Sequence, residues 1–97
     1  MLVALSSFEL RIPGCTSLKE KRHVLKGLTA GLRARFNLAV AEVDHQDQWQ
    51  RATLGVSAVA GQGFHLRKVM HEVERFVERQ PGVELIGHRM TLHSQDD

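Results

Sequence analysis

The clearest secondary-structure signal in this 97-residue sequence is an amphipathic helix at residues 66–77, LRKVMHEVERFV. Its apolar residues follow the i, i+3, i+4, i+7 spacing of one helix face. They are Leu66, Val69, Met70, Val73, Phe76 and Val77. Gly61-Gln62-Gly63 precedes the helix and Pro81-Gly82 follows it, and glycine and proline in such places are typical of breaks between elements. The helix therefore has defined ends and one apolar face to bury.

Segments with strand character lie on both sides of this helix. Residues 38–43 and 52–60 are short and rich in alanine, valine and leucine, and residues 83–92 have the composition of a last strand. Residues 2–12 alternate with the period of two that is typical of a strand with one buried face. The apolar side has Leu2, Ala4, Phe8, Leu10 and Ile12, and the other side has Ser7, Glu9 and Arg11.

A first helix is predicted from about Leu18 to about Phe36. Ser17-Leu18-Lys19-Glu20 matches a capping box, in which Ser17 accepts from first-turn amides and Glu20 reaches back. The order of elements is then β-α-β-β-α-β. Because each helix has a single apolar stripe, both are expected to cover one face of a four-stranded antiparallel sheet, an α+β, ferredoxin-like sandwich. We predict one domain at residues 1–93 and a short polar tail at residues 94–97.

Composition is that of a packed protein, with 42% hydrophobic and 25% charged residues. No apolar run approaches the roughly 20 residues of a membrane span, and no targeting signal precedes the first strand, so a cytoplasmic chain without membrane contact is expected. Cys15 is the single cysteine, which excludes an internal disulfide. The six histidines have no ligand spacing, and we expect no metal and no cofactor.

Positive charge is concentrated in the first helix. Residues 10–41 carry seven lysines and arginines against one acidic residue. On a helical wheel, Lys19, Arg22, Lys26 and Arg33 fall within about 60° of one another, outside the apolar arc. This basic stripe could track a phosphate backbone, and the alternative is a solvated helix face. Lys21 and Arg35 lie nearer the apolar arc, so their stems are expected to cover the core while their charges reach solvent.

The opposite side of the first helix has small residues, namely Gly27, Ala30, Gly31 and Ala34. Two interior glycines cost about 1 kcal/mol each in helix propensity, which favours close approach of another backbone. The neighbour is expected to be the second helix, with a copy of the protein as the alternative.

The polar segment between the second and third strands gathers chemically active side chains. They are Glu42, Asp44, His45, Asp47, Trp49 and Arg51. Such a set could perform acid/base chemistry or hold a divalent ion, but no nucleophile or phosphate-loop motif accompanies it. A stiffening ion pair between Asp47 and Arg51 is the simpler interpretation. Trp49 could stack on a base or seal the hairpin, and Cys15 could be a thiol of lowered pKa near a helix N-terminus or a passive small residue.

Several blocks resemble the YlxP-like family of small bacterial proteins of unknown function. They are Ile12-Pro-Gly, Ser17-Leu-Lys-Glu-Lys-Arg22, Arg35-Phe-Asn37, Val40-Ala-Glu-Val43, and His45-Gln-Asp47 leading to Trp49-Gln-Arg-Ala52. The resemblance extends to about Leu92 and implies a ferredoxin-like fold. It also implies genes that neighbour those of transcription elongation, translation initiation and ribosome maturation factors, and no established activity. Cys15 departs from the family pattern, in which a small uncharged residue such as alanine is usual.

The expected function is that of a non-enzymatic accessory protein that binds structured RNA or the ribosome. In an RNA-recognition motif, aromatic residues of the first and third strands stack on bases. Here the third strand has no aromatic residue and Phe8 of the first strand falls on the helix-facing side, so binding would depend on charge and shape. The candidate nucleic-acid contacts are Lys19, Arg22, Lys26, Arg33, Lys21, Arg35, Arg11, Trp49 and Arg51. One alternative is a homodimer through Val3, Leu5 and Val59, which are apolar on the open sheet face. A regulatory domain that binds a small ligand is another.

Overall fold

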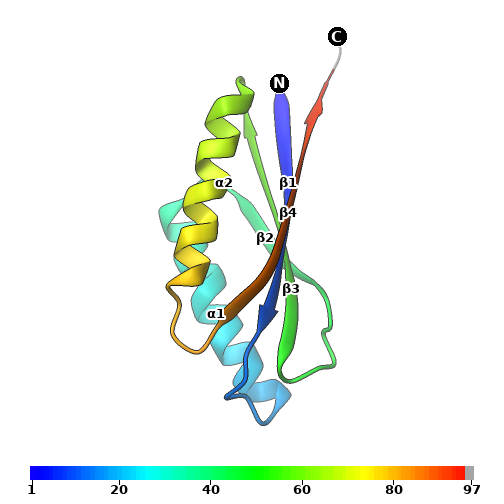
Figure 1. Cartoon of the computed structure of the whole chain (residues 1–97), viewed down its shortest axis with the longest axis vertical. Coiled ribbons are helices and arrows are strands. Elements are labelled where there is room, and N and C mark those ends of the chain that lie inside the picture. Colours follow the sequence, from blue (N-terminus) through cyan, green and yellow to red (C-terminus); the bar gives the residue numbers. More distant parts are fainter. Residues whose placement is uncertain (96–97) are drawn as a thin grey trace.

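The computed structural model describes residues 1–95 and has the predicted element order. The elements are β1 (Leu2–Arg11), α1 (Leu18–Arg35), β2 (Ala39–Asp44), β3 (Arg51–Ala60), α2 (Gly63–Glu78) and β4 (Glu84–Ser94). The strands form one sheet in the order β2-β3-β1-β4, with every neighbouring pair antiparallel. Figure 1 shows both helices on the same side of this sheet. The ferredoxin-like α+β prediction is confirmed.

β1 is the centre of the sheet because it pairs with both β3 and β4. Its alternating pattern buries Ala4, Phe8 and Leu10 completely against the helices. At the end of the sheet, Ser94 belongs to β4, and the Gln95 N–H donates to the Met1 carbonyl. The tail predicted at residues 94–97 therefore begins after the strand, and its residues 96–97 lie outside the described residues.

The N-terminus of α1 has one half of the predicted capping box. The Ser17 hydroxyl accepts from the Glu20 N–H at 3.1 Å, as expected. The Glu20 carboxylate, however, accepts from the Thr16 hydroxyl at 2.7 Å and from the Thr16 N–H at 3.2 Å, one residue before the N-cap. These two bonds, the hydroxyl bond first, lower the pKa of Glu20. The reciprocal bond to Ser17 was predicted wrongly because the threonine hydroxyl offers a second donor.

Part of the small-residue side of α1 lies against α2. A Cβ placed on Gly31 would lie 2.9 Å from Cζ of Phe76, so the absence of a side chain makes room for this ring. Gly27 has no atom within 4 Å of the corresponding position, and Ala30 and Ala34 are exposed. The predicted contact with the second helix is thus confirmed at Gly31 and does not extend along the whole side.

Candidate nucleic-acid interface

Three members of the basic stripe line a shallow groove between α1 and β2. Arg22, Lys26 and Arg33 border a hollow of about 270 Å³ whose floor includes Val40 and Leu54. We call it the α1/β2 groove. Lys19 is exposed on α1 one turn before Arg22. The groove runs beside β2, which is an edge strand of the sheet.

The groove lining includes one carboxylate, that of Glu42, and it pairs with Lys21 and not with the basic stripe. Over residues 1–95, no carboxylate oxygen lies within 4 Å of the charged groups of Lys19, Arg22 or Lys26. Arg33 donates from Nη2 to the Val40 carbonyl at 2.8 Å, which ties the end of α1 to β2. A neutral carbonyl leaves the guanidinium charge in place, so all four cations contribute to a positive surface.

Lys21 does not belong to this surface. Its side chain is 1% exposed, and its Nζ atom lies 2.7 Å from Oε2 of Glu42 on β2. The prediction that its charge reaches solvent is therefore wrong. The hairpin between β2 and β3 folds over the ammonium group and supplies polar partners there, so the charge is satisfied inside the protein.

Lys21 fastens both ends of the hairpin loop to α1. Its ammonium donates to the carbonyls of His45 at 2.7 Å and Arg51 at 3.2 Å, and it lies 3.4 Å from that of Gln46. His45 has a positive φ of 63°, an uncommon backbone conformation for a residue other than glycine. Among the described groups, the buried Oε2 of Glu42 has the ammonium as its polar partner. We call this set of contacts the Lys21 latch.

Two further hydrogen bonds hold the loop at Gln50. The Gln50 side-chain amide donates to the Cys15 carbonyl at 3.1 Å, and the Ile12 N–H donates to the Gln50 carbonyl at 2.9 Å. The latch and these bonds join the first turn of α1, and the residues just before it, to the hairpin loop that leads into β3. Two of the blocks that carry the family resemblance, Ser17–Arg22 and Trp49–Ala52, are therefore in direct contact.

Several charged side chains of the hairpin pair with residues of other elements. Arg51 Nη2 lies 3.9 Å from Oε2 of Glu9, so it pairs with β1 and the predicted ion pair with Asp47 is wrong. The same Glu9 oxygen accepts from the Thr53 hydroxyl at 2.9 Å and lies 3.8 Å from His45 Nε2. No group of three potential metal ligands exists among the residues that the structure describes.

The remaining candidate contacts are dispersed over the molecule. Trp49 is 52% exposed, which does not support the alternative in which it seals the hairpin, and its indole is accessible in the loop. Arg11 lies 3.8 Å from Glu84 at the other sheet edge. Arg35 faces α2, with its Cζ atom 5.9 Å from the centre of the Phe76 ring. Of the nine residues predicted to contact nucleic acid, the structure therefore brings together on one surface the four of the basic stripe.

Cys15 is a buried structural residue, 3% exposed. Burial raises the pKa of its thiol, the nearby Glu20 carboxylate adds to this increase, and Lys21 opposes it. The alternative of a thiol whose pKa is lowered by the helix N-terminus is therefore wrong. The passive interpretation agrees with the structure.

We expect Cys15 to react with iodoacetamide at least about tenfold more slowly in the folded protein than in urea, because the thiolate is the reacting species and is both scarce and covered. Since the folded pKa is raised, the rate of the folded protein should keep increasing with pH after that of the unfolded chain has levelled off. Mass spectrometry of the alkylated fraction with time measures both. A folded rate that levels off at lower pH than the unfolded rate would contradict this account.

A partly buried set of polar contacts connects β1, β4 and α2, and sequence reasoning missed it. His88 Nδ1 lies 2.7 Å from Glu74 Oε2, which accepts, and His88 Nε2 lies 3.1 Å from the Ser6 hydroxyl. The His88 ring stacks on Phe8 with centroids 4.1 Å apart. The connectivity is that of a serine, histidine and carboxylate triad, but Ser6 is only 5% exposed. These contacts join α2 to β4 and β1 through His88. Alternation along β4 was the available signal, since it puts His88 on the buried face.

The fold and the latch define a class of small ferredoxin-like α+β protein in which a basic first helix is fastened to an edge hairpin. The chain belongs to the family described as "Protein of unknown function (DUF503)", whose sequence profile matches residues 3–90. It is similar to the "Uncharacterized protein YlxP" of Bacillus subtilis (strain 168), with 32% identity over 83 residues that cover 86% of this chain and 90% of that protein. The expected family resemblance is confirmed. None of the described helices has the length and apolar character needed to cross a membrane.

Proposed function

We propose that this protein is a non-enzymatic accessory protein that binds structured RNA, as RNA alone or within the ribosome, through the α1/β2 groove. The observation that carries the proposal is the row of unneutralised cations Lys19, Arg22 and Lys26 along successive turns of α1 beside an edge strand. An RNA backbone presents phosphates in a row, and each cation that neutralises a phosphate releases a counterion. Lys21 and Arg33 support this surface by fixing α1 to the hairpin and to β2.

The Lys21 latch gives the proposed surface a fixed shape. Because α1 and the hairpin are joined through a buried ammonium, the cations of the stripe are presented from a rigid element. Preorganised charges bind with a smaller loss of conformational entropy than charges on a mobile segment. Trp49, exposed in the hairpin, offers a ring on which an unpaired base could stack.

The experiment is fluorescence anisotropy of a labelled hairpin RNA titrated with the protein between about 50 and 200 mM salt. Three phosphate contacts predict a linear fall of log K with log salt, with a slope of about −3. Binding that is absent at every salt concentration, or that does not respond to salt, would show that the groove is a solvated helix face.

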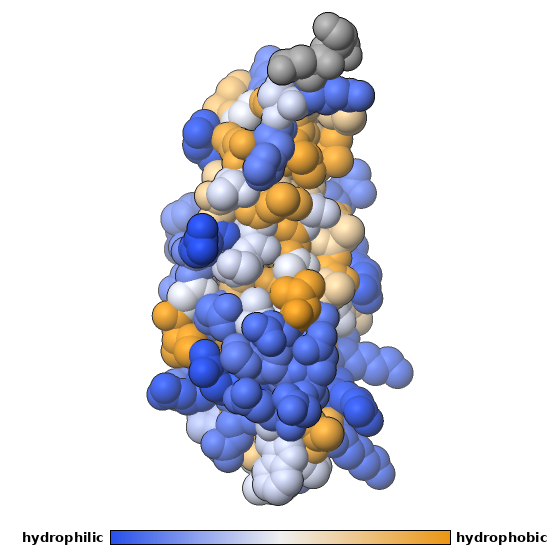
Figure 2. Space-filling view, turned by 90° about the vertical axis from the view of Figure 1, so that its right-hand side faces the viewer, coloured by the Kyte–Doolittle hydropathy of each residue, from blue (hydrophilic) through white to orange (hydrophobic). Residues whose placement is uncertain are grey.

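A second candidate function is self-association through the open sheet face, and the occupant we propose is a second copy of the chain. Leu5 is 47% exposed and Val59 63% exposed, and Val3 pairs with Val59 in the register. Figure 2 shows many apolar residues over the upper part of this face and mostly hydrophilic ones over the lower part. A hollow of about 350 Å³ lies beside Leu5, over the small residues Ala41 and Gly55. Projecting side chains next to a hollow on one surface are what a two-fold symmetric interface needs.

We expect Leu5→Glu to weaken this dimer at least about tenfold, because it moves a charge into an apolar contact. Phe64→Glu is the matched control, since Phe64 is 70% exposed on α2, on the helix side of the sheet. Light scattering at high micromolar concentration compares both variants with the parent, and Phe64→Glu should keep the parent's mass. A monomeric parent, or a dimer that persists unchanged in Leu5→Glu, would reject the interface.

A further inference from the structure

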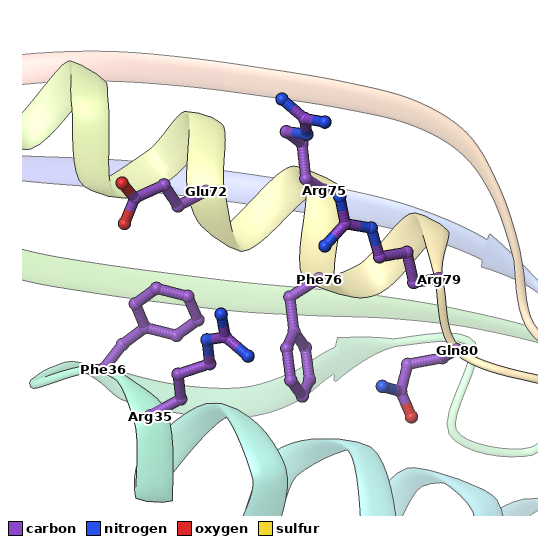
Figure 3. A pocket seen from close by; sticks show the side chains of 7 residues that line it. All are labelled: Arg35, Phe36, Glu72, Arg75, Phe76, Arg79 and Gln80. Carbon is purple, nitrogen blue, oxygen red and sulfur yellow. The ribbon is translucent and has the colours of Figure 1, made fainter.

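A pocket of about 500 Å³ lies between α1 and α2, on the helix layer and away from the basic stripe. Its lining includes Arg35, Phe36, Glu72, Arg75, Phe76 and Arg79. We call it the interhelical pocket. Figure 3 shows the Arg35 guanidinium in the space between the helices, beside the rings of Phe36 and Phe76, and Arg79 folded back along α2 toward Arg75. Its volume is within the range of roughly 300 to 1,000 Å³ that small-molecule sites occupy.

The pocket carries three guanidinium groups against one carboxylate. Across the described part of the chain, Arg35, Arg75 and Arg79 have no carboxylate oxygen within 4 Å. Three like charges around one hollow repel one another, and an anion in the hollow would relieve this repulsion. Guanidinium groups also fit phosphate oxygens in a forked, two-bond geometry.

The wall of the pocket is aromatic and held in place. The rings of Phe36 and Phe76 meet edge to face, with centroids 6.1 Å apart and planes at 90°. Phe76 can occupy this position because Gly31 has no side chain, and Arg35 lies over its ring at 5.9 Å. Aromatic faces and flat guanidinium groups are the surfaces on which nucleobases stack in proteins.

A simpler explanation of the arginines is that cations favour helix C-termini. Arg35 and Arg75 do lie in the last turns of α1 and α2, and Arg79 is the C-cap of α2. Within residues 1–95, however, none of these three side chains donates a hydrogen bond to a helix-terminal carbonyl. The helix dipole also gives no reason for two phenyl rings and a hollow between the three charges.

We propose that the interhelical pocket binds a nucleoside phosphate, with Arg75 and Arg79 on the phosphate and the Arg35, Phe36 and Phe76 wall beside the base. The ligand is either a free mononucleotide or an unpaired nucleotide of a bound RNA, and only the second source rests on the proposed function. Glu72 opposes an anion in this pocket and tunes the affinity downward.

The test is isothermal titration calorimetry of the full chain with adenosine 5′-diphosphate, adenosine and inorganic phosphate. The diphosphate should bind at least about tenfold more tightly than either fragment, because it engages both the charges and the aromatic wall. The double variant Arg75→Gln, Arg79→Gln should lose at least about tenfold in affinity, and Glu72→Gln should gain about two- to tenfold. Arg67→Gln, an exposed arginine earlier on α2, is the matched control and should change little.

A second titration separates the two sources of the ligand. If the pocket takes an unpaired RNA nucleotide, a hairpin RNA with a single-stranded 3′ extension should bind more tightly than a blunt hairpin, and the double variant should remove this difference. Charge reversal of the basic stripe should leave diphosphate binding unchanged even where it abolishes RNA binding. The proposal is overturned if the double variant weakens neither the binding of the diphosphate nor the binding due to the 3′ extension. It is also overturned if Arg67→Gln weakens binding as much as the double variant does.

Discussion

Lys21→Met is expected to lower the free energy of unfolding by about 3 to 5 kcal/mol, the range for removing one partner of a buried ion pair. The substitution keeps the apolar stem and removes the ammonium from a site that is 1% exposed. It leaves Glu42 Oε2 and the carbonyls of His45 and Arg51 without their donor. Each unsatisfied buried acceptor costs free energy because it has given up water without gaining a partner.

Lys19→Met is the matched control for this prediction. Lys19 is on the same turn of α1, is exposed and makes no ion pair among the described residues, so its loss should change the free energy of unfolding by no more than about 0.5 kcal/mol. Urea denaturation followed by circular dichroism measures both variants. Equal effects of the two substitutions would show that the latch contributes nothing to stability.

Reversing Lys19, Arg22 and Lys26 to glutamate is expected to weaken binding of a structured RNA at least about 100-fold at low salt, because three attractive phosphate contacts become repulsive. The corresponding glutamine triple variant should make the salt slope shallower by about 3, which counts the lost contacts. Both variants change exposed side chains and should remain folded.

The control for the charge reversal is a second triple variant that changes the net charge by the same amount on another surface. Arg67, Lys68 and Arg89 are exposed on α2 and β4, away from the α1/β2 groove. Their conversion to glutamate should weaken RNA binding far less, through the general field of the protein. If the two triple variants lose the same affinity, RNA is attracted by net charge and the groove has no special role.

The fold could be predicted from the sequence because hydrophobic periodicity reports which face of each element is buried. The alternation around Phe8 and the helical spacing around Val73 gave the correct faces, and both residues are fully buried. These signals are local, and so they do not depend on which elements become neighbours. The same local reasoning placed the basic stripe correctly on the surface of α1.

The Lys21 latch could not be predicted because a helical wheel gives the direction of a side chain and says nothing about what covers it. Lys21 was placed near the apolar arc, but its burial depends on the hairpin, whose carbonyls lie 24 or more residues away in the chain. A lysine beside the apolar arc, followed by a glutamate in the next strand, is the one signal that could have suggested the pair.

The interhelical pocket depends likewise on contacts between distant residues. Arg35 and Phe36 were assigned to the end of one helix, and Phe76 to the apolar stripe of the other. Their meeting follows from the close approach of α1 and α2 at Gly31, where a Cβ would lie 2.9 Å from the Phe76 ring. The small-residue pattern indicated the approach, but it did not indicate which charges would surround it.

The most direct test of RNA binding by the α1/β2 groove is a titration of the ¹⁵N-labelled protein with a hairpin RNA, followed by amide chemical shifts. Binding in the α1/β2 groove should give the largest shifts in residues 19–33 of α1 and along β2, with small shifts at Leu5 and Val59 on the open sheet face. Shifts confined to the open face, or no shifts at an RNA concentration above that of the protein, would contradict it.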